Sequence, residues 1–203
     1  MSERFDTLFA GMSEETAMET LLKPPAELKN PGLKYLAATR LGACQSPESL
    51  QRLLAAGAND SDDLYERITR RKALEALGRR KDRSALPVLL AALQADDEPT
   101  VVNAADAIAR LSTPLDKEEQ TALLQALQGP DNQRRAVLQA FCRLGMNDAS
   151  GQIDHCRNDS NPLVAGAAHA YAVRVLGDQQ GLHPLMEQLR DDNPGRRRAA
   201  VID

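Results

Sequence analysis

Three arginine side chains, Arg67, Arg70 and Arg71, form a concentrated group of charged hydrogen-bond donors. They lie in the stretch ERITRRKALEALGRR (66–80), where six of fifteen residues are Arg or Lys although the whole chain carries a formal net charge of −4. Spacings of three and four residues place them along one face of a helix. Guanidinium groups bind carboxylates and phosphates through paired hydrogen bonds. The stretch therefore predicts either an anion-binding site or a set of ion pairs within the protein.

Motifs for covalent or metal chemistry are missing from the sequence. His155 and Cys156 look like a dyad, but adjacent residues on a helix point about 100° apart, so we interpret the pair as incidental. Cys44 is expected to lie exposed in a turn, and the chain has no CxxC. No Gly-rich phosphate loop, metal-ligand spacing or nucleophile motif is found. The catalytic residues therefore stay unknown, and no metal site is predicted.

The composition predicts a protein made of closely packed helices. Hydrophobic residues make up 42% of the chain but aromatic residues only 3%, with no Trp, so Ala, Leu and Val must supply the buried surface. No apolar run reaches the length of a membrane span, and the N-terminus MSERFDTLF lacks the layout of a secretory signal. We therefore expect a soluble, cytoplasmic protein that does not insert into a membrane.

Two sequence markers recur with one common period. A proline recurs every 31 or 32 residues, at Pro99, Pro130, Pro162 and Pro194. A Leu-Gly pair ends an apolar helical segment at four places, Leu41-Gly42, Leu77-Gly78, Leu144-Gly145 and Leu176-Gly177, with a degraded copy at Leu111-Ser112. Two independent markers that share a period indicate a repeat architecture.

Each repeat is predicted to hold two helices. Val102, Ala105 and Ile108 recur at helical spacing in PTVVNAADAIARL (99–111), whereas SALPVLLAALQADD (84–97) reads as a second helix with Ser84 as its N-cap. A hairpin of about 33 residues cannot bury both faces alone, so copies stack. The predicted fold is an all-α solenoid of stacked helix hairpins, a HEAT-like or armadillo-type superhelix, because the signatures of tetratricopeptide and ankyrin repeats are absent.

The markers divide the chain into seven segments. Residues 1–30 are predicted to form an N-terminal helical cap, with a short helix in SEETAMETLL (13–22). Five HEAT-like repeats follow, at about 31–60, 61–98, 99–130, 131–161 and 162–193. Residues 194–203 start an incomplete sixth repeat, so we expect either a piece of a longer solenoid or a chain completed by a partner.

The repeat alignment singles out Arg70 and Arg71. Sister repeats place mostly small or apolar residues at these two positions, and burying an unpaired Arg is too costly to occur without a partner. One interpretation pairs the arginines with acidic turns of the same chain, such as Asp96-Asp97 or Asp62-Asp63. The other gives them a ligand anion. Nucleic acid is disfavoured, because the chain has only six aromatic residues and its acidic turns would repel phosphates.

The segment LYERITRRKALEALGRRKDRSALPVLLAALQADDEPTVVNAADAIARL (64–111) resembles the HEAT-like repeats of the phycobilin lyases, specifically the E/F type and its phycoerythrin-associated branch. KYLAATRLGACQSPESLQRLL (34–54) and RFDTLFAGMSEETAMETLL (4–22) fit the same organisation. The resemblance implies a cyanobacterial protein that helps attach an open-chain tetrapyrrole, such as phycoerythrobilin, to a cysteine of a phycobiliprotein subunit. Some relatives also isomerise the bilin, and others act as chaperone-like helpers.

The same resemblance gives the arginines a ligand. A bilin carries two propionates, so we expect Lys34, Tyr65, Arg67, Arg70 and Arg71 to form the anion-binding end of a bilin groove. The bilin is a substrate, and no cofactor is expected. The implied partners are a phycobiliprotein subunit, with phycoerythrin foremost, and either a second lyase chain or a C-terminal half, since relatives are about twice as long or work as pairs. The alternative is a non-catalytic HEAT-repeat chaperone or scaffold that binds such subunits or other proteins.

Overall fold

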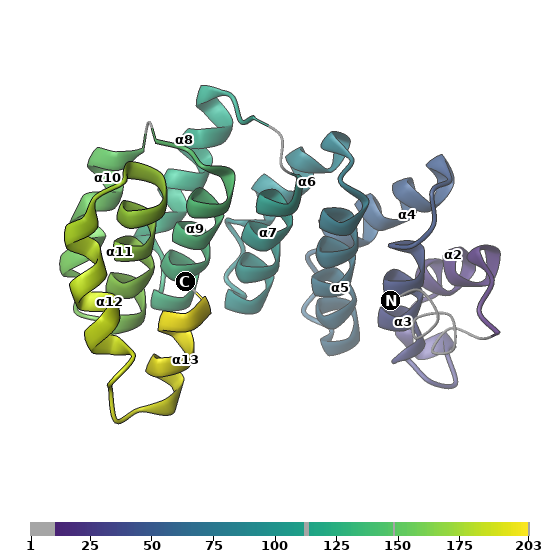
Figure 1. The fold of residues 1–203 in the computed structure, drawn as a ribbon. Helices are drawn as coiled ribbons and strands as arrows, with labels where there is room; N and C mark the ends of the chain where they lie inside the picture. The colour runs from purple at the N-terminus through teal and green to yellow at the C-terminus, as the bar shows by residue number, and fades with distance from the viewer. Residues whose placement is uncertain (1–10, 112–113, 148, 203) are drawn as a thin grey trace. The chain divides into compact units, whose positions relative to one another are not determined.

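The computed structural model describes residues 11–111, 114–147 and 149–202. The chain divides into two compact units, residues 1–111 and 112–203, and each is described by itself. Every regular element in the described ranges is helical, which confirms the predicted all-α class (Figure 1). Within these ranges no helix combines the length and the apolar character needed to cross a bilayer.

The first unit is organised around its longest helix, α5 (Leu64–Arg80), which packs against α3, α4 and α7. Figure 1 shows α3, α5 and α7 as successive helices of one layer. The other helices of this unit are α2 (Glu14–Leu22), α3 (Leu33–Leu41), α4 (Pro47–Ala58), α6 (Leu86–Ala92) and α7 (Glu98–Leu111), with 3₁₀ turns η1 (Pro25–Glu27) and η2 (Arg83–Ala85).

Helix α5 is stabilised at both ends by its own sequence. Its N-cap, Asp63, accepts hydrogen bonds from the backbone N–H groups of Tyr65 at 2.9 Å and Glu66 at 3.0 Å. Arg79 and Arg80 occupy the last turn, where cations interact favourably with the helix dipole. Leu, Ala, Glu, Lys and Arg, which make up most of its length, are strong helix formers, so this polar segment is helical without an extended apolar stripe.

Helix α6, the partner of α5 in the second predicted repeat, begins later than the sequence predicts. Ser84 is not its N-cap: the Asp82 carboxylate accepts the Ser84 backbone N–H at 2.9 Å and caps the 3₁₀ turn η2, after which α6 starts at Leu86. Asp is a favourable N-cap residue, and Asp82 takes this role two residues before Ser84. Leu86 and Leu89 of this helix are buried.

The second unit is organised around α11 (Pro162–Leu176), which packs against α9, α10, α12 and α13. Phe141 and Tyr171 are buried in its core, and the Tyr171 hydroxyl donates to the backbone carbonyl of Met146 at 2.6 Å. The remaining helices of this unit are α8 (Lys117–Gln125), α9 (Asp131–Leu144), α10 (Ser150–Asp154), α12 (Leu182–Gln188) and α13 (Pro194–Ile202), with 3₁₀ turns η3 (Ala126–Gln128), η4 (His155–Asn158) and η5 (Gln179–Gly181).

Each of the five predicted repeat ranges contains one pair of these helices, and α13 lies in the predicted sixth segment. The division between the two units falls within the range 99–130. In the predicted cap, α2 forms where expected, and the Ser13 hydroxyl accepts the Thr16 backbone N–H at 3.1 Å. Residues 1–10 of that cap lie outside the described residues. The limits of the repeats stay predictions.

The repeated Leu-Gly marker serves two different purposes. Gly145 and Gly177 end α9 and α11 in the left-handed conformation, with φ of 64° and 72°. Gly78 instead lies inside α5, facing Ala107 of α7, and a Cβ at this position would lie 2.6 Å from the Ala107 Cα. The missing side chain therefore sets how closely α5 and α7 approach.

We expect Gly78→Ala to lower the free energy of unfolding by about 1–3 kcal/mol, since the added methyl would force α5 and α7 apart. Gly151→Ala is the matched control: its Cβ would meet nothing within 4 Å, so the change should raise helix stability by up to about 1 kcal/mol. Urea unfolding of both variants measures the difference. Equal stabilities would contradict the close helix approach.

Candidate functional site

The five residues predicted to form one anion site do not come together in one pocket. Lys34 lines a pocket of about 540 Å³ near α2 and α4, here called the N-terminal pocket. Arg67 and Arg70 line a pocket of about 340 Å³ between the α4–α5 and α6–α7 loops, here called the aspartate pocket. Arg71 and Tyr65 line neither of these two pockets.

Lys34 is a buried structural cation. Its side chain is 3% exposed, and its Nζ donates to the backbone carbonyls of Leu21 at 2.9 Å and Lys23 at 2.6 Å. The third partner is the Glu66 carboxylate, at 2.8 Å. Three acceptors use all three donors of an ammonium group. Lys34 therefore joins the C-terminal end of α2 to the first turn of α5 and has no donor left for a ligand.

Arg71 and Arg67 both bind the Asp97 carboxylate. The Nε of Arg71 donates to Oδ2 of Asp97 at 2.9 Å, and its Nη2 donates to Oδ1. Arg67 donates from Nη2 to the same Oδ1 at 2.6 Å. The Arg71 contact is the bidentate geometry that the planar guanidinium favours. The interpretation that pairs these arginines with the acidic turn Asp96-Asp97 is thus confirmed for Asp97.

Asp97 also caps α7, because Oδ2 accepts the backbone N–H of Thr100 at 3.0 Å and the Thr100 hydroxyl. Burial by itself raises the pKa of the Asp97 carboxyl, but the hydrogen bonds from Arg71, Thr100 and Arg67 outweigh it and hold that pKa well below its ordinary value. One carboxylate thereby joins the middle of α5 to the start of α7.

Arg70 is buried, with 9% of its surface exposed, and binds the loop before α5. Its Nε donates to the Gly57 carbonyl at 3.2 Å, and its Nη1 pairs with the Asp60 carboxylate. Gly57 lies in the last turn of α4, where carbonyls lack partners within the helix. Arg70 therefore closes the end of α4. Its carboxylate partner is Asp60 rather than the Asp62-Asp63 pair expected from the sequence.

The basic end of α5 acts in the same way on the preceding repeat. The Nη1 of Arg80 donates to the Ser49 hydroxyl at 2.7 Å, and its Nη2 donates to the Ser46 carbonyl at 3.0 Å. Arg79 donates to the Thr39 carbonyl at 3.3 Å. The basic face of α5 thus holds the ends of α3, α4 and α7, which explains why a basic helix occurs in an acidic protein.

Charge disfavours an anion in the aspartate pocket. Four carboxylates, those of Asp60, Asp62, Asp96 and Asp97, line it beside the two guanidinium groups of Arg67 and Arg70. Both guanidinium groups already have carboxylate partners. A propionate entering this pocket would compete with existing ion pairs and meet the remaining negative charge. The ligand-binding role predicted for Lys34, Tyr65, Arg67, Arg70 and Arg71 stays a prediction.

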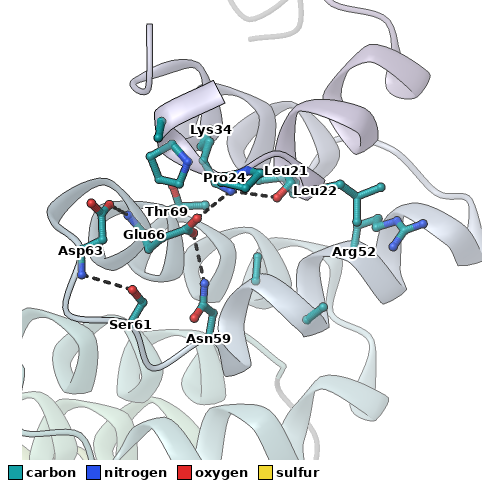
Figure 2. A pocket seen from close by; sticks show the side chains of 14 residues that line it. Leu21, Leu22, Pro24, Lys34, Arg52, Asn59, Ser61, Asp63, Glu66 and Thr69 are labelled. Atoms are coloured by element: carbon teal, nitrogen blue, oxygen red, sulfur yellow. Dashed lines mark hydrogen bonds and ion pairs between the residues drawn. The ribbon is translucent and has the colours of Figure 1, made fainter. Parts of the chain in front are cut away.

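The N-terminal pocket combines an apolar wall with a polar floor (Figure 2). The wall comes from α2, the segment after it and α4, and consists of Leu21, Leu22, Pro24, Pro25, Ala55 and Ala56. The floor holds the Lys34–Glu66 pair, and the Asn59 side chain donates to Glu66 at 3.1 Å. Arg52 of α4 lines the pocket too, and no sequence signal had distinguished it from an ordinary surface residue of an amphipathic helix.

Neither Cys44 nor Cys156 has the lowered thiol pKa that is typical of a reactive cysteine. Cys44, expected to be exposed, is buried at 7% exposure, because α3 ends in a tight turn that directs the thiol to the Arg40 carbonyl. Burial raises the pKa of the Cys44 thiol, and burial likewise raises the pKa of Cys156. Among the described residues, no group of three or more His, Cys, Asp or Glu side chains is arranged to hold a metal ion.

Proteins with similar sequences include one named for the phycocyanin operon and two named for bilin biosynthesis. Residues 65–142 match the family model for HEAT repeats. An uncharacterized phycocyanin operon protein, protein Y of Pseudanabaena tenuis, is 27% identical over 203 residues, which cover 100% of this chain and 48% of protein Y. The bilin biosynthesis protein PecE of Nostoc sp. is 32% identical over 135 residues, 66% of this chain and 53% of PecE. The chain spans about half the length of the curated relatives it matches.

A solved structure resembles the chain over most of its length. It is the complex of CpcE and CpcF of phycocyanin lyase from Nostoc sp.. The similarity covers 93% of this chain and 74% of the matched chain, with a TM-score of 0.74 and 25% sequence identity. The fold is therefore an all-helical HEAT-repeat stack of the kind found in that complex.

We expect Asp97→Asn to lower the free energy of unfolding by about 2–3 kcal/mol at pH 7, because Asn keeps the cap but loses two charged partners. The folded-state pKa of Asp97 is depressed, so its contribution is present above the unfolded value of about 3.9 and is lost as pH falls below it. The difference between wild type and variant should narrow by about 1 kcal/mol between pH 5 and pH 3.

Chemical denaturation across that pH range measures this narrowing. Asp106→Asn is the control, since Asp106 pairs with Arg110 at an exposed i,i+4 position and should contribute less than about 0.5 kcal/mol. A pH-independent difference for Asp97→Asn would show that its carboxylate charge does not hold α5 to α7.

Proposed function

We propose that this chain, a HEAT-repeat relative of the E/F-type bilin lyase subunits, takes part in attaching an open-chain tetrapyrrole to a cysteine of a phycobiliprotein subunit. The observation that carries the proposal is the likeness to the phycocyanin lyase complex over 93% of the chain, at a TM-score of 0.74. Sequence similarity to PecE, named for bilin biosynthesis, supports the same function independently. We propose the same kind of activity for this chain as for the longer relatives, although it spans about half their length.

Thioether attachment of a bilin does not require a nucleophilic side chain from this protein. Thioether formation adds the S–H group of the acceptor cysteine across a carbon–carbon double bond of the bilin. Sulfur and proton both end on the pigment, so the step needs neither an oxidant nor a leaving group. The acceptor supplies the nucleophile, which agrees with the raised thiol pKa values of Cys44 and Cys156. The protein's contribution is then to hold the bilin in a reactive conformation, with water excluded.

We also propose that this chain works with a second lyase polypeptide. The similar solved structure is a complex of two polypeptides, CpcE and CpcF. We propose that this chain likewise works with an F-type lyase chain or an equivalent C-terminal half. A finer proposal, taken from the resemblance of residues 64–111, is that the pigment is phycoerythrobilin and the acceptor a phycoerythrin subunit.

Coexpression of this chain with bilin-synthesis enzymes and an apo-phycobiliprotein subunit is expected to yield a covalent, fluorescent adduct. The panel should contain phycoerythrin and phycocyanin subunits, each with and without an F-type chain. Zinc-stained denaturing gels and mass spectrometry measure the adduct. The control omits this chain. Adduct that stays at the control level for every combination contradicts the lyase proposal, and a stable complex without adduct supports the chaperone alternative.

Substitution of Arg70 and Arg71 distinguishes an ion-pairing role of these side chains from a ligand-binding role. Changing Arg70 and Arg71 together to Gln is expected to lower the melting temperature, because both side chains hold helix ends. Bilin affinity per folded molecule should be unchanged if ion pairing is their whole role. A loss of roughly 1–3 kcal/mol in bilin binding, with stability intact, would instead support the propionate site predicted from the sequence. Absorbance titration and thermal unfolding distinguish the two, with Arg198→Gln as the control.

A further inference from the structure

The N-terminal pocket presents apolar surface that the fold leaves uncovered. Leu22, at the end of α2, is 59% exposed and lines the pocket together with Pro24 and Pro25. Ala55 and Ala56 of α4 add to the same wall. The volume of about 540 Å³ falls in the range typical of small-molecule sites, which combine apolar walls with a few polar groups. The pocket thus has the size and lining of a site for a flexible, largely apolar molecule.

Arg52 is a cation of this pocket that has no partner among the described residues. Its side chain is exposed and makes no hydrogen bond or ion pair with any residue that the structure describes. Lys34, the other cation lining the pocket, already has three acceptors. Figure 2 draws Arg52 together with Leu22 on one side of the pocket, away from the Lys34–Glu66 pair. An anion could therefore bind Arg52 without breaking an existing contact.

Neither of the two carboxylates that line the pocket forms an ion pair with Arg52. Glu66 is neutralised by Lys34 and also accepts from Asn59. Asp63 accepts the two backbone N–H groups at the start of α5 through Oδ1, at 2.9 and 3.0 Å. Both acidic groups therefore accept hydrogen bonds from within the protein, whereas the Arg52 guanidinium has no such partner among the residues that the structure describes. A ligand with an apolar body and a carboxylate arm fits this arrangement.

We propose that the N-terminal pocket binds the open-chain tetrapyrrole, with pyrrole rings against the wall formed by Leu22, Pro24 and Ala56 and one propionate on Arg52. The identity of the ligand rests on the proposed function, and the site itself rests on the pocket. Arg52 is then a specificity-determining residue that distinguishes a free propionate from its ester.

The test compares biliverdin with its dimethyl ester, which has the same tetrapyrrole but no carboxylate. Absorbance titration of the wild-type chain should show about tenfold tighter binding of the acid, the effect of one hydrogen-bonded charge pair. Arg52→Gln should weaken binding of the acid by about tenfold and leave the ester unchanged. Arg198→Gln, which removes an exposed Arg of the other unit, should change neither.

A second variant tests the apolar wall. Leu22→Ser should weaken acid and ester equally, by severalfold, since it removes apolar contact without removing charge. Leu64→Ser is its matched control, because Leu64 is 60% exposed and lines neither described pocket. Circular dichroism and melting temperatures verify that each variant is folded.

Two results overturn the site. One is binding of the acid that is equally tight in wild type and Arg52→Gln, and the other is an absence of biliverdin binding by the wild-type chain. Neither result decides the proposed function, because adduct formation in the coexpression assay is measured separately. An Arg52→Gln chain that binds biliverdin normally and still supports adduct formation would leave the lyase role standing and place the bilin elsewhere.

Discussion

The structure of the first unit depends on how the ends of its short helices are satisfied. Each helix end leaves backbone groups without partners, and a stack of short helices has many such ends. Helix α5 supplies the missing partners through its basic side chains. Arg70 binds the Gly57 carbonyl at the end of α4, and Arg80 binds the Ser46 carbonyl before α4. Arg71 acts on the start of α7 indirectly, by fixing the Asp97 carboxylate that caps it.

This use of charge restricts where a ligand anion can bind. The guanidinium groups of Arg67, Arg70 and Arg71 already have carboxylate partners. Moving one of them to a ligand would cost the contact that it makes in the fold. Arg52 could bind a ligand without losing such a contact, because it is exposed on α4 and forms no hydrogen bond or ion pair with the described residues. The basic side chains of α5 therefore stabilise the fold, whereas Arg52, which has no partner in the described ranges and lies beside apolar surface, is the better candidate for binding an anion.

A bilin-binding role suits a scaffold of this kind. Attachment of a tetrapyrrole to a thiol requires the pigment to be held in one conformation and shielded, and the nucleophile comes from the acceptor. A rigid stack of closely packed, alanine-rich helices can present such a pocket without a catalytic motif. The close approach of α5 and α7 at Gly78 and Ala107 fixes the spacing of these helices at the end of α5 that lies away from the two pockets of this unit. The structural similarity to the phycocyanin lyase complex is the main reason for proposing such a role.

The sequence by itself determined the helical class, the repeat period and the position of the basic helix, because these depend on local propensity and on spacing along the chain. It also restricted the partners of Arg70 and Arg71 to a carboxylate of the chain or to a ligand, since a buried unpaired cation is too costly. Only the tertiary structure decided that Asp97 and Asp60 are those partners. The same holds for the N-terminal pocket, where Leu22, Lys34 and Arg52 come from three helices that meet only when the repeats stack. Spacing along a helix predicts which side chains share a face, but the distance between faces of different helices is fixed by packing alone.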